Sequence, residues 1–158
     1  NPDNLAFATQ TTLSVDDTSK ILSILKSRFP KIKGPSSEDI CYATTNRQLA
    51  VKSMSKICDC VLVIGAENSS NSVRLVEVAL SQGVKKAILI PNEYQLDLFL
   101  KKFNPIKSPN IGLTAGASAP ETLVQVLISK LQKDFEVNLI HHEVTKEDVK
   151  FNLPKILR

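Results

Sequence analysis

Three clusters of hydroxyl and amide side chains each follow a short apolar run and precede a helical pattern. They are Thr9-Gln10-Thr11-Thr12, Asn68-Ser69-Ser70-Asn71-Ser72 and Thr114-Ala115-Gly116-Ala117-Ser118. Ligands of parallel α/β sheets collect at the carboxyl ends of strands, and the free N–H groups at a helix start favour an anion. Any one cluster could simply cap its helix. Because such clusters recur at equivalent positions, and each holds more Ser, Thr and Asn than a cap needs, they predict a shared site for a diphosphate-like ligand.

Cys41 occupies a comparable position. It follows the apolar Ile40 and precedes the polar stretch Tyr42-Ala43-Thr44-Thr45-Asn46. A free cysteine is often only a small buried hydrophobic residue. A thiolate at the end of a strand could instead ligate a metal centre. The residue pattern alone leaves both interpretations open.

The other two cysteines, Cys58 and Cys60, lie at a helix-to-strand junction, at the opposite end of the predicted sheet. We interpret them as packing residues, with a redox or metal pair as the alternative. No Cys/His spacing typical of zinc is present, and the absence of paired cysteine spacing indicates a reducing compartment. His141 and His142 fall in a polar segment, and we expect them on the surface or between domains.

Short apolar runs alternate with amphipathic helical patterns along the chain. The expected strands are residues 5–9, 40–43, 61–64, 87–90 and 110–114, with 149–153 as a possible last strand. The expected helices are residues 15–28, a helix capped by Asn46, and residues 72–81, 93–103 and 121–132. Ile21, Leu22, Ile24 and Leu25 form the apolar side of the first helix. The periodic residues of the second helix, Leu49, Val51, Met54 and Ile57, are expected to face a core.

Continuous apolar strands between amphipathic helices indicate parallel sheets that are covered on both faces. The sequence therefore predicts an α/β fold with two small three-layer α/β domains and mainly parallel sheets. The predicted domains are residues 1–86, which contain Cys41, and residues 87–158, which contain Ser118.

The composition is that of an ordinary globular protein, with 158 residues, 42% hydrophobic and 23% charged. The apolar runs are too short to span a membrane. The net charge of +4 comes from scattered Lys and Arg without a basic stripe, so we expect neither a membrane nor nucleic acid as a partner. A mildly positive surface would suit an anionic substrate or an acidic electron carrier. No signal peptide is visible and no initiator Met is present, so we expect a longer parent protein.

Four ordered motifs resemble the 4-hydroxy-3-methylbut-2-enyl diphosphate reductase (IspH/LytB) family over essentially the whole chain. They are residues 9–18, 39–48, 65–72 and 114–120, and residues 151–154 resemble the closing segment of that family. The resemblance implies a trefoil of three α/β domains around a [4Fe–4S] cluster that three cysteines hold. It also implies a compartment, which is the bacterial cytoplasm or a plastid-type organelle.

The activity that the resemblance implies is the last step of the non-mevalonate isoprenoid pathway. Two electrons from ferredoxin or flavodoxin, with protons, remove the hydroxyl group of 4-hydroxy-3-methylbut-2-enyl diphosphate as water. The products are isopentenyl and dimethylallyl diphosphate. The matching residues are Cys41 for the cluster, Thr11 for the reacting end, and Ser69, Ser70, Asn71 and Ser118 for the diphosphate.

The sequence also departs from the family. The other two cluster cysteines, the substrate-binding histidines and the proton-donating glutamate belong to an N-terminal domain that is missing here, and Cys58 and Cys60 do not fall at matching positions. We therefore expect this chain to be inactive by itself. Two alternatives stay open: a non-catalytic α/β module that binds a phosphate ligand, and a thiol redox protein that uses Cys58 and Cys60.

Overall fold

A parallel sheet of three strands forms the centre of the fold. The computed structural model describes residues 2–35, 39–103, 108–146 and 156. The strands are β1 (Cys60–Ile64), β2 (Lys86–Ile90) and β3 (Ile111–Ala115), in the order β2-β1-β3. Every pairing is parallel. This arrangement confirms the predicted α/β class.

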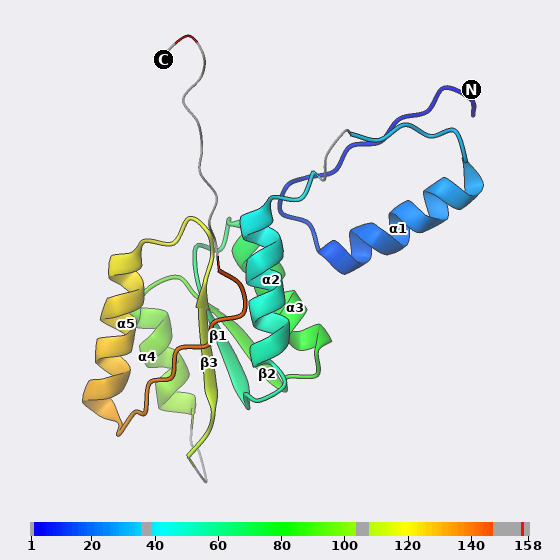
Figure 1. Cartoon of the computed structure of the whole chain (residues 1–158). Coiled ribbons are helices and arrows are strands. Elements are labelled where there is room, and N and C mark those ends of the chain that lie inside the picture. Colours follow the sequence, from blue (N-terminus) through cyan, green and yellow to red (C-terminus); the bar gives the residue numbers. More distant parts are fainter. Residues whose placement is uncertain (1, 36–38, 104–107, 147–155, 157–158) are drawn as a thin grey trace.

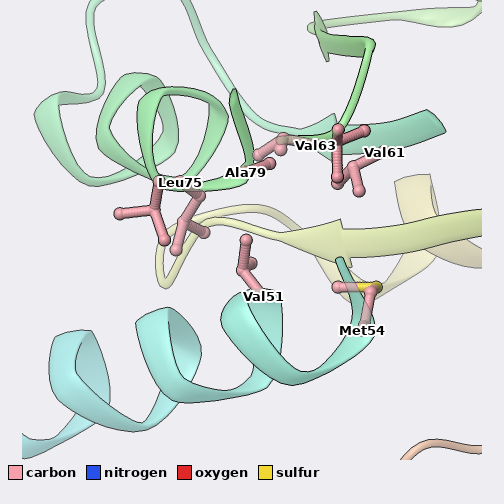
Figure 2. Close-up of a cluster of buried hydrophobic side chains, with 8 residues drawn as sticks. Val51, Met54, Val61, Val63, Leu75 and Ala79 are labelled. Carbon is pink, nitrogen blue, oxygen red and sulfur yellow. The ribbon is translucent and has the colours of Figure 1, made fainter. Parts of the chain in front are cut away.

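Helices cover both faces of the sheet (Figure 1). On one face lie α2 (Tyr42–Met54) and α3 (Ser70–Ser81), and on the other lie α4 (Glu93–Lys102) and α5 (Glu121–Asp134). Figure 2 shows Val61 and Val63 of β1 packed with Val51 of α2 and Leu75 of α3. The alternate residues of β1 pack against α4 and α5, so every β1 side chain is buried. Burial on both faces explains why the strand is uniformly apolar.

Most helix boundaries agree with the sequence because the capping residues are local signals. Helix α1 (Val15–Arg28) begins after Ser14, whose side chain accepts a hydrogen bond from the backbone N–H of Asp17. Asn92 caps α4 in the same way, through the N–H of Gln95. Helix α3 begins two residues earlier than predicted because Ser69 is its cap. Such caps satisfy N–H groups that a helix start leaves unpaired.

The predicted strand at residues 40–43 is wrong. Helix α2 begins at Tyr42, and Cys41 rather than Asn46 is its N-cap. The carbonyl oxygen of Cys41 accepts hydrogen bonds from the N–H groups of Thr44 and Thr45, at 2.9 and 3.0 Å. Helix α2 therefore includes the polar stretch from Tyr42 to Asn46.

The N-terminal segment forms less structure than predicted. The expected strand at residues 5–9 is reduced to an isolated parallel bridge between Ala6 and Lys33. Helix α1 connects these two residues and projects away from the sheet (Figure 1). Ile21 and Ile24, on the apolar side of this helix, are 58% and 67% exposed, so no core covers these two side chains within the part of the chain described here.

Exposure also corrects the prediction for the second helix. Leu49 and Ile57 are exposed, whereas Val51 and Met54 of the same pattern are buried. The sheet is narrow, and α3 takes the other half of the face that α2 covers, so only one side of α2 meets the core.

The three strands join both sides of the predicted domain boundary. Residues 86 and 87 both belong to β2, which pairs with β1 along its whole length. The division at residue 86 and the trefoil stay predictions, and the suggested strand at residues 149–153 lies outside the described residues. Within the described residues, no helix is long and apolar enough to cross a membrane.

Candidate functional site

The sheet brings two of the predicted polar clusters together. Strands β1 and β3 are parallel neighbours, with Ile64 opposite Ala115 at their carboxyl ends. The next residues, Gly65 and Gly116, continue this pairing, since the Gly116 N–H donates to the Ile64 carbonyl oxygen at 2.8 Å. The turns after β1 and β3 therefore start side by side. This edge of the sheet is where α/β proteins bind ligands.

Ser72 fills the space between these two glycines. Its side chain is fully buried at the start of α3. A Cβ atom placed on either Gly65 or Gly116 would lie 2.1 Å from the Ser72 Oγ. Only glycine permits this close approach of backbone and side chain. The glycines thus let both turns close onto the first turn of α3.

Ser72 in turn sets the direction of the Ser69 hydroxyl. The Ser69 Oγ accepts hydrogen bonds from the Ser72 N–H at 3.3 Å and from the Ser72 Oγ at 3.0 Å. A hydroxyl has two acceptor lone pairs and one donor hydrogen. With its acceptor positions occupied, Ser69 has its O–H left to donate. A donor at a helix N-terminus is suited to an anionic oxygen.

Asn71 is the most unusual polar residue of the site. Its side chain is only 6% exposed, yet neither the Oδ1 nor the Nδ2 has a hydrogen-bond partner among the described residues. An unsatisfied buried amide costs about 1–3 kcal/mol, and such groups are rare in folded proteins. The orphaned amide lies in the first turn of α3, between two hydroxyl residues of the same cluster. A polar ligand would satisfy it.

The N-terminal loop joins this edge through Thr12. The Thr12 Oγ1 lies 3.0 Å from the Ser70 Oγ, so the first and second polar clusters are in direct contact. We did not single out Thr12 from the sequence, although it belongs to the predicted Thr9–Thr12 cluster. Thr11 is exposed, and its carbonyl oxygen accepts a hydrogen bond from the Cys41 N–H at 3.1 Å. Thr11 and Cys41 are therefore neighbours.

Cys41 and Ser118 complete the predicted set. Cys41 has an exposed thiol, and its side chain makes no capping hydrogen bond to α2 among the described residues. Ser118 is exposed in the turn that links β3 to α5, and the Ala119 N–H donates to the Gly116 carbonyl oxygen at 3.0 Å within that turn. Both side chains are thus available to partners from outside the turn or helix that carries them.

The remaining thiols lie at the opposite end of β1 and are packing residues, as we predicted. Burial raises the pKa of Cys60 to about 11, and burial followed by the charge of Asp59 raises the pKa of Cys58. Both groups therefore stay protonated near neutral pH, which makes them poor nucleophiles and poor metal ligands. This argues against the thiol redox alternative.

The two histidines lie on the surface, as we expected. His141 and His142 are exposed, and the His142 Nε2 lies 3.0 Å from the Ser53 Oγ of α2. They border a hollow of about 690 Å³ next to the end of β3, together with Arg47.

The glycine contacts lead to a prediction that distinguishes the two turns. In Gly116→Ala, the new methyl group meets the Ser72 Oγ, and we expect a loss of stability of about 1–3 kcal/mol, as for overpacked cores. Adding Ser72→Ala should restore most of that stability, because the next closest Ser72 atom, its Cβ, is 3.3 Å from the new methyl group. The same rescue should fail for Gly65→Ala, where the Ser72 Cβ lies at 2.7 Å. Melting temperatures of the single and double variants measure this difference, and equal rescue at both glycines would contradict it.

Comparison with known proteins places this geometry in a family. The family model described as LytB protein matches residues 1–132 of the chain. The chain belongs to the LytB family. The matched range includes every element of the site, from Thr11 to Ser118.

Relatives of this LytB chain are named as reductases. The chain is 48% identical over 158 residues to 4-hydroxy-3-methylbut-2-enyl diphosphate reductase 2 of Rhodopseudomonas palustris. The alignment covers all of this chain and 48% of that protein. It is 55% identical over 154 residues to the reductase of Hyphomonas neptunium, again with 48% of that protein covered. The solved E-1-hydroxy-2-methyl-but-2-enyl-4-diphosphate reductase of Plasmodium falciparum matches 98% of this chain and 48% of its own, with a TM-score of 0.82 and 36% identity. The chain thus spans about half the length of these relatives.

The thiols of this LytB chain fit only part of an iron–sulfur site. Thiolates are the ligands that such clusters require, and Cys41 is the exposed thiol among the three cysteines. Among the described residues, no group of three or more His, Cys, Asp or Glu side chains could hold a metal ion. Cys41 therefore suits one ligand position, and the other ligands of a cluster would have to come from outside the described residues.

Proposed function

We propose that this chain forms about half of a 4-hydroxy-3-methylbut-2-enyl diphosphate reductase and supplies its diphosphate site. The observation that carries the proposal is the buried amide of Asn71, near Ser69 at the start of α3, which has no hydrogen-bond partner among the described residues. Diphosphate oxygens are acceptors that would pair with the Asn71 Nδ2 and the Ser69 O–H. The names of the relatives agree with a diphosphate substrate.

Neutral donors do most of the binding in this proposal. Ser69, Ser70 and Asn71 lie at the start of α3, where free N–H groups and the helix dipole favour an anion. Ser118 approaches from the turn after β3, which pairs with β1 through Gly116. Hydroxyl and amide groups avoid the desolvation penalty of burying a charged side chain. The substrate's negative charge is thus held without a buried cation from the described part of the chain.

Thr11 and Cys41 would lie at the reacting end of the substrate. The hydrogen bond from the Cys41 N–H to the Thr11 carbonyl oxygen keeps the two residues together. Thr11 is a hydroxyl residue that can donate a hydrogen bond to the substrate's hydroxyl group as that group leaves. A [4Fe–4S] cluster held partly by Cys41 would supply the electrons of the reduction, received from ferredoxin or flavodoxin. With two electrons and two protons, the hydroxyl group leaves as water and a new C–H bond forms on the allylic carbon skeleton, which gives isopentenyl or dimethylallyl diphosphate.

The remaining parts of the proposal concern the whole protein. A missing N-terminal domain would supply the other cluster ligands and complete a trefoil of three domains. The chain alone would then be inactive. The bacterial cytoplasm or a plastid-type organelle is the compartment that we propose.

Turnover by the full-length protein tests the proposal. The protein is reconstituted with iron and sulfide without oxygen, reduced with dithionite and methyl viologen, and given 4-hydroxy-3-methylbut-2-enyl diphosphate. We expect isopentenyl and dimethylallyl diphosphate by mass spectrometry. Diphosphate binding without turnover by the reconstituted protein would favour the non-catalytic binding module instead.

A further inference from the structure

We propose that Gln48 is a positioning residue that sets Thr11 and Thr12 against Cys41, an inference that rests on the proposed function. Gln48 lies on α2 and is 1% exposed. It is one of the few fully buried polar side chains described, and both ends of its amide are engaged.

The amide bridges the start of α1. The Gln48 Oε1 accepts from the Val15 N–H at 3.0 Å, and the Gln48 Nε2 donates to the Leu13 carbonyl oxygen at 2.8 Å. The Val15 N–H is one of the groups that a helix start leaves without an intrahelical partner. A single side chain thus holds the backbone on both sides of Ser14, the N-cap of α1. Because Gln48 is buried and both bonds are at least partly shielded from water, losing them costs more than losing a surface contact.

The two Gln48 hydrogen bonds determine the position of the loop that contains Thr11 and Thr12. Thr12 precedes Leu13 directly, so the Gln48 bond to Leu13 also holds the Thr12 contact with Ser70. The N-cap of the same helix is Cys41, whose N–H donates a hydrogen bond to the Thr11 carbonyl oxygen. Helix α2 therefore carries both anchors of the loop, and its rigid geometry relates the loop to the cysteine.

The ion pair between α1 and α2 is a weak substitute for Gln48, although the Thr9 N–H also anchors the preceding residues to the Asp39 carboxylate at 2.7 Å. Helix α1 projects away from the sheet (Figure 1), and its ion pair with α2, Lys52 to Asp16 at 2.7 Å, is partly exposed. Exposed ion pairs contribute little to stability. Residue 48 must also supply an acceptor for the Val15 N–H and a donor for the Leu13 carbonyl oxygen at the same time. Glutamate keeps the acceptor for Val15 and loses the donor for Leu13, and methionine fills similar space with neither.

Turnover of the full-length holoenzyme with the diphosphate substrate is the first measurement. We expect Gln48→Met to lower kcat on the order of tenfold to a hundredfold, as small misplacements of reacting groups do, with a smaller rise in KM. Gln48→Glu should fall between Gln48→Met and the native enzyme. Val78→Ala is the control, since it weakens the buried cluster of α3 without touching these hydrogen bonds. A kcat loss in Val78→Ala as large as that in Gln48→Met would overturn the proposal, because stability alone would then explain the effect.

A double-mutant cycle with Thr11→Val separates an effect of Gln48 on the position of Thr11 from an effect on the stability of the protein. If Gln48 acts through the loop, Gln48→Met should change kcat less than twofold in the Thr11→Val background, because coupled residues are not additive. Fully multiplied losses would overturn the proposal.

Amide hydrogen exchange in the same full-length protein gives a readout that does not depend on activity. Faster exchange at Val15 is expected in Gln48→Met, while Gln48→Glu should keep Val15 protected. Unchanged exchange in Gln48→Met would overturn the positioning role even in an active enzyme. Absent turnover in the native holoenzyme would instead overturn the proposed function, and the exchange result would still decide the role of Gln48 in the loop.

Discussion

Cys41→Ser in the full-length protein is expected to abolish turnover and to remove most of the visible absorbance of the reconstituted cluster. The thiol is exposed at the N-cap of α2, next to Thr11, where it can reach a cluster. A serine hydroxyl keeps the size of the side chain but supplies a much poorer ligand than a thiolate. Absorbance and electron paramagnetic resonance spectra of the anaerobic protein measure cluster content, and product formation measures turnover.

The matched control for this variant is Cys58→Ser. Cys58 is half-buried at the far end of β1 and packs against the hydrophobic side chains around Val51 and Met54. We expect its substitution to keep the absorbance and the activity, at some cost in stability. If the absorbance survived in Cys41→Ser and disappeared in Cys58→Ser, the assignment of Cys41 would be wrong and a site at Cys58 and Cys60 would be favoured.

Asn71→Leu is expected to have two effects of opposite sign. In the ligand-free protein it removes a buried amide that has no partner among the described residues, so stability should rise by about 1–3 kcal/mol. In the enzyme it removes a donor to a charged ligand, worth on the order of 1.5–3 kcal/mol, so KM should rise by about tenfold or more. Thermal unfolding without ligand and steady-state kinetics of the full-length protein measure the two effects.

An exposed amide provides the control for Asn71. Asn138 lies outside the site in the segment after α5, and Asn138→Leu should leave both the melting temperature and KM near those of the native protein. A lower melting temperature in Asn71→Leu would show that the amide has a structural partner. Unchanged KM would remove Asn71 from the diphosphate site.

Local sequence signals were sufficient for much of the fold. The apolar run of β1 and the amphipathic patterns of residues 15–28 and 93–103 predicted elements that the structure contains. Residues 5–9 form only an isolated bridge and Ile24 stays exposed, so within the described residues no sheet or core covers these apolar side chains. An apolar pattern predicts which face of a helix or strand can pack against another surface, but it does not show whether that surface belongs to the same chain.

The sequence by itself determined the α/β class, the family and the positions of the polar clusters, because strand patterns, caps and motifs are local features. The tertiary structure decided how these parts meet. Gly65 and Gly116 are far apart in the sequence and share Ser72 only because β1 and β3 pair in parallel. The burial of the Asn71 amide without a partner among the described residues, and the bonds of Gln48 to the start of α1, likewise depend on packing between distant segments. Burial and long-range hydrogen bonds follow from the folded arrangement of the whole chain, so no local pattern could predict them.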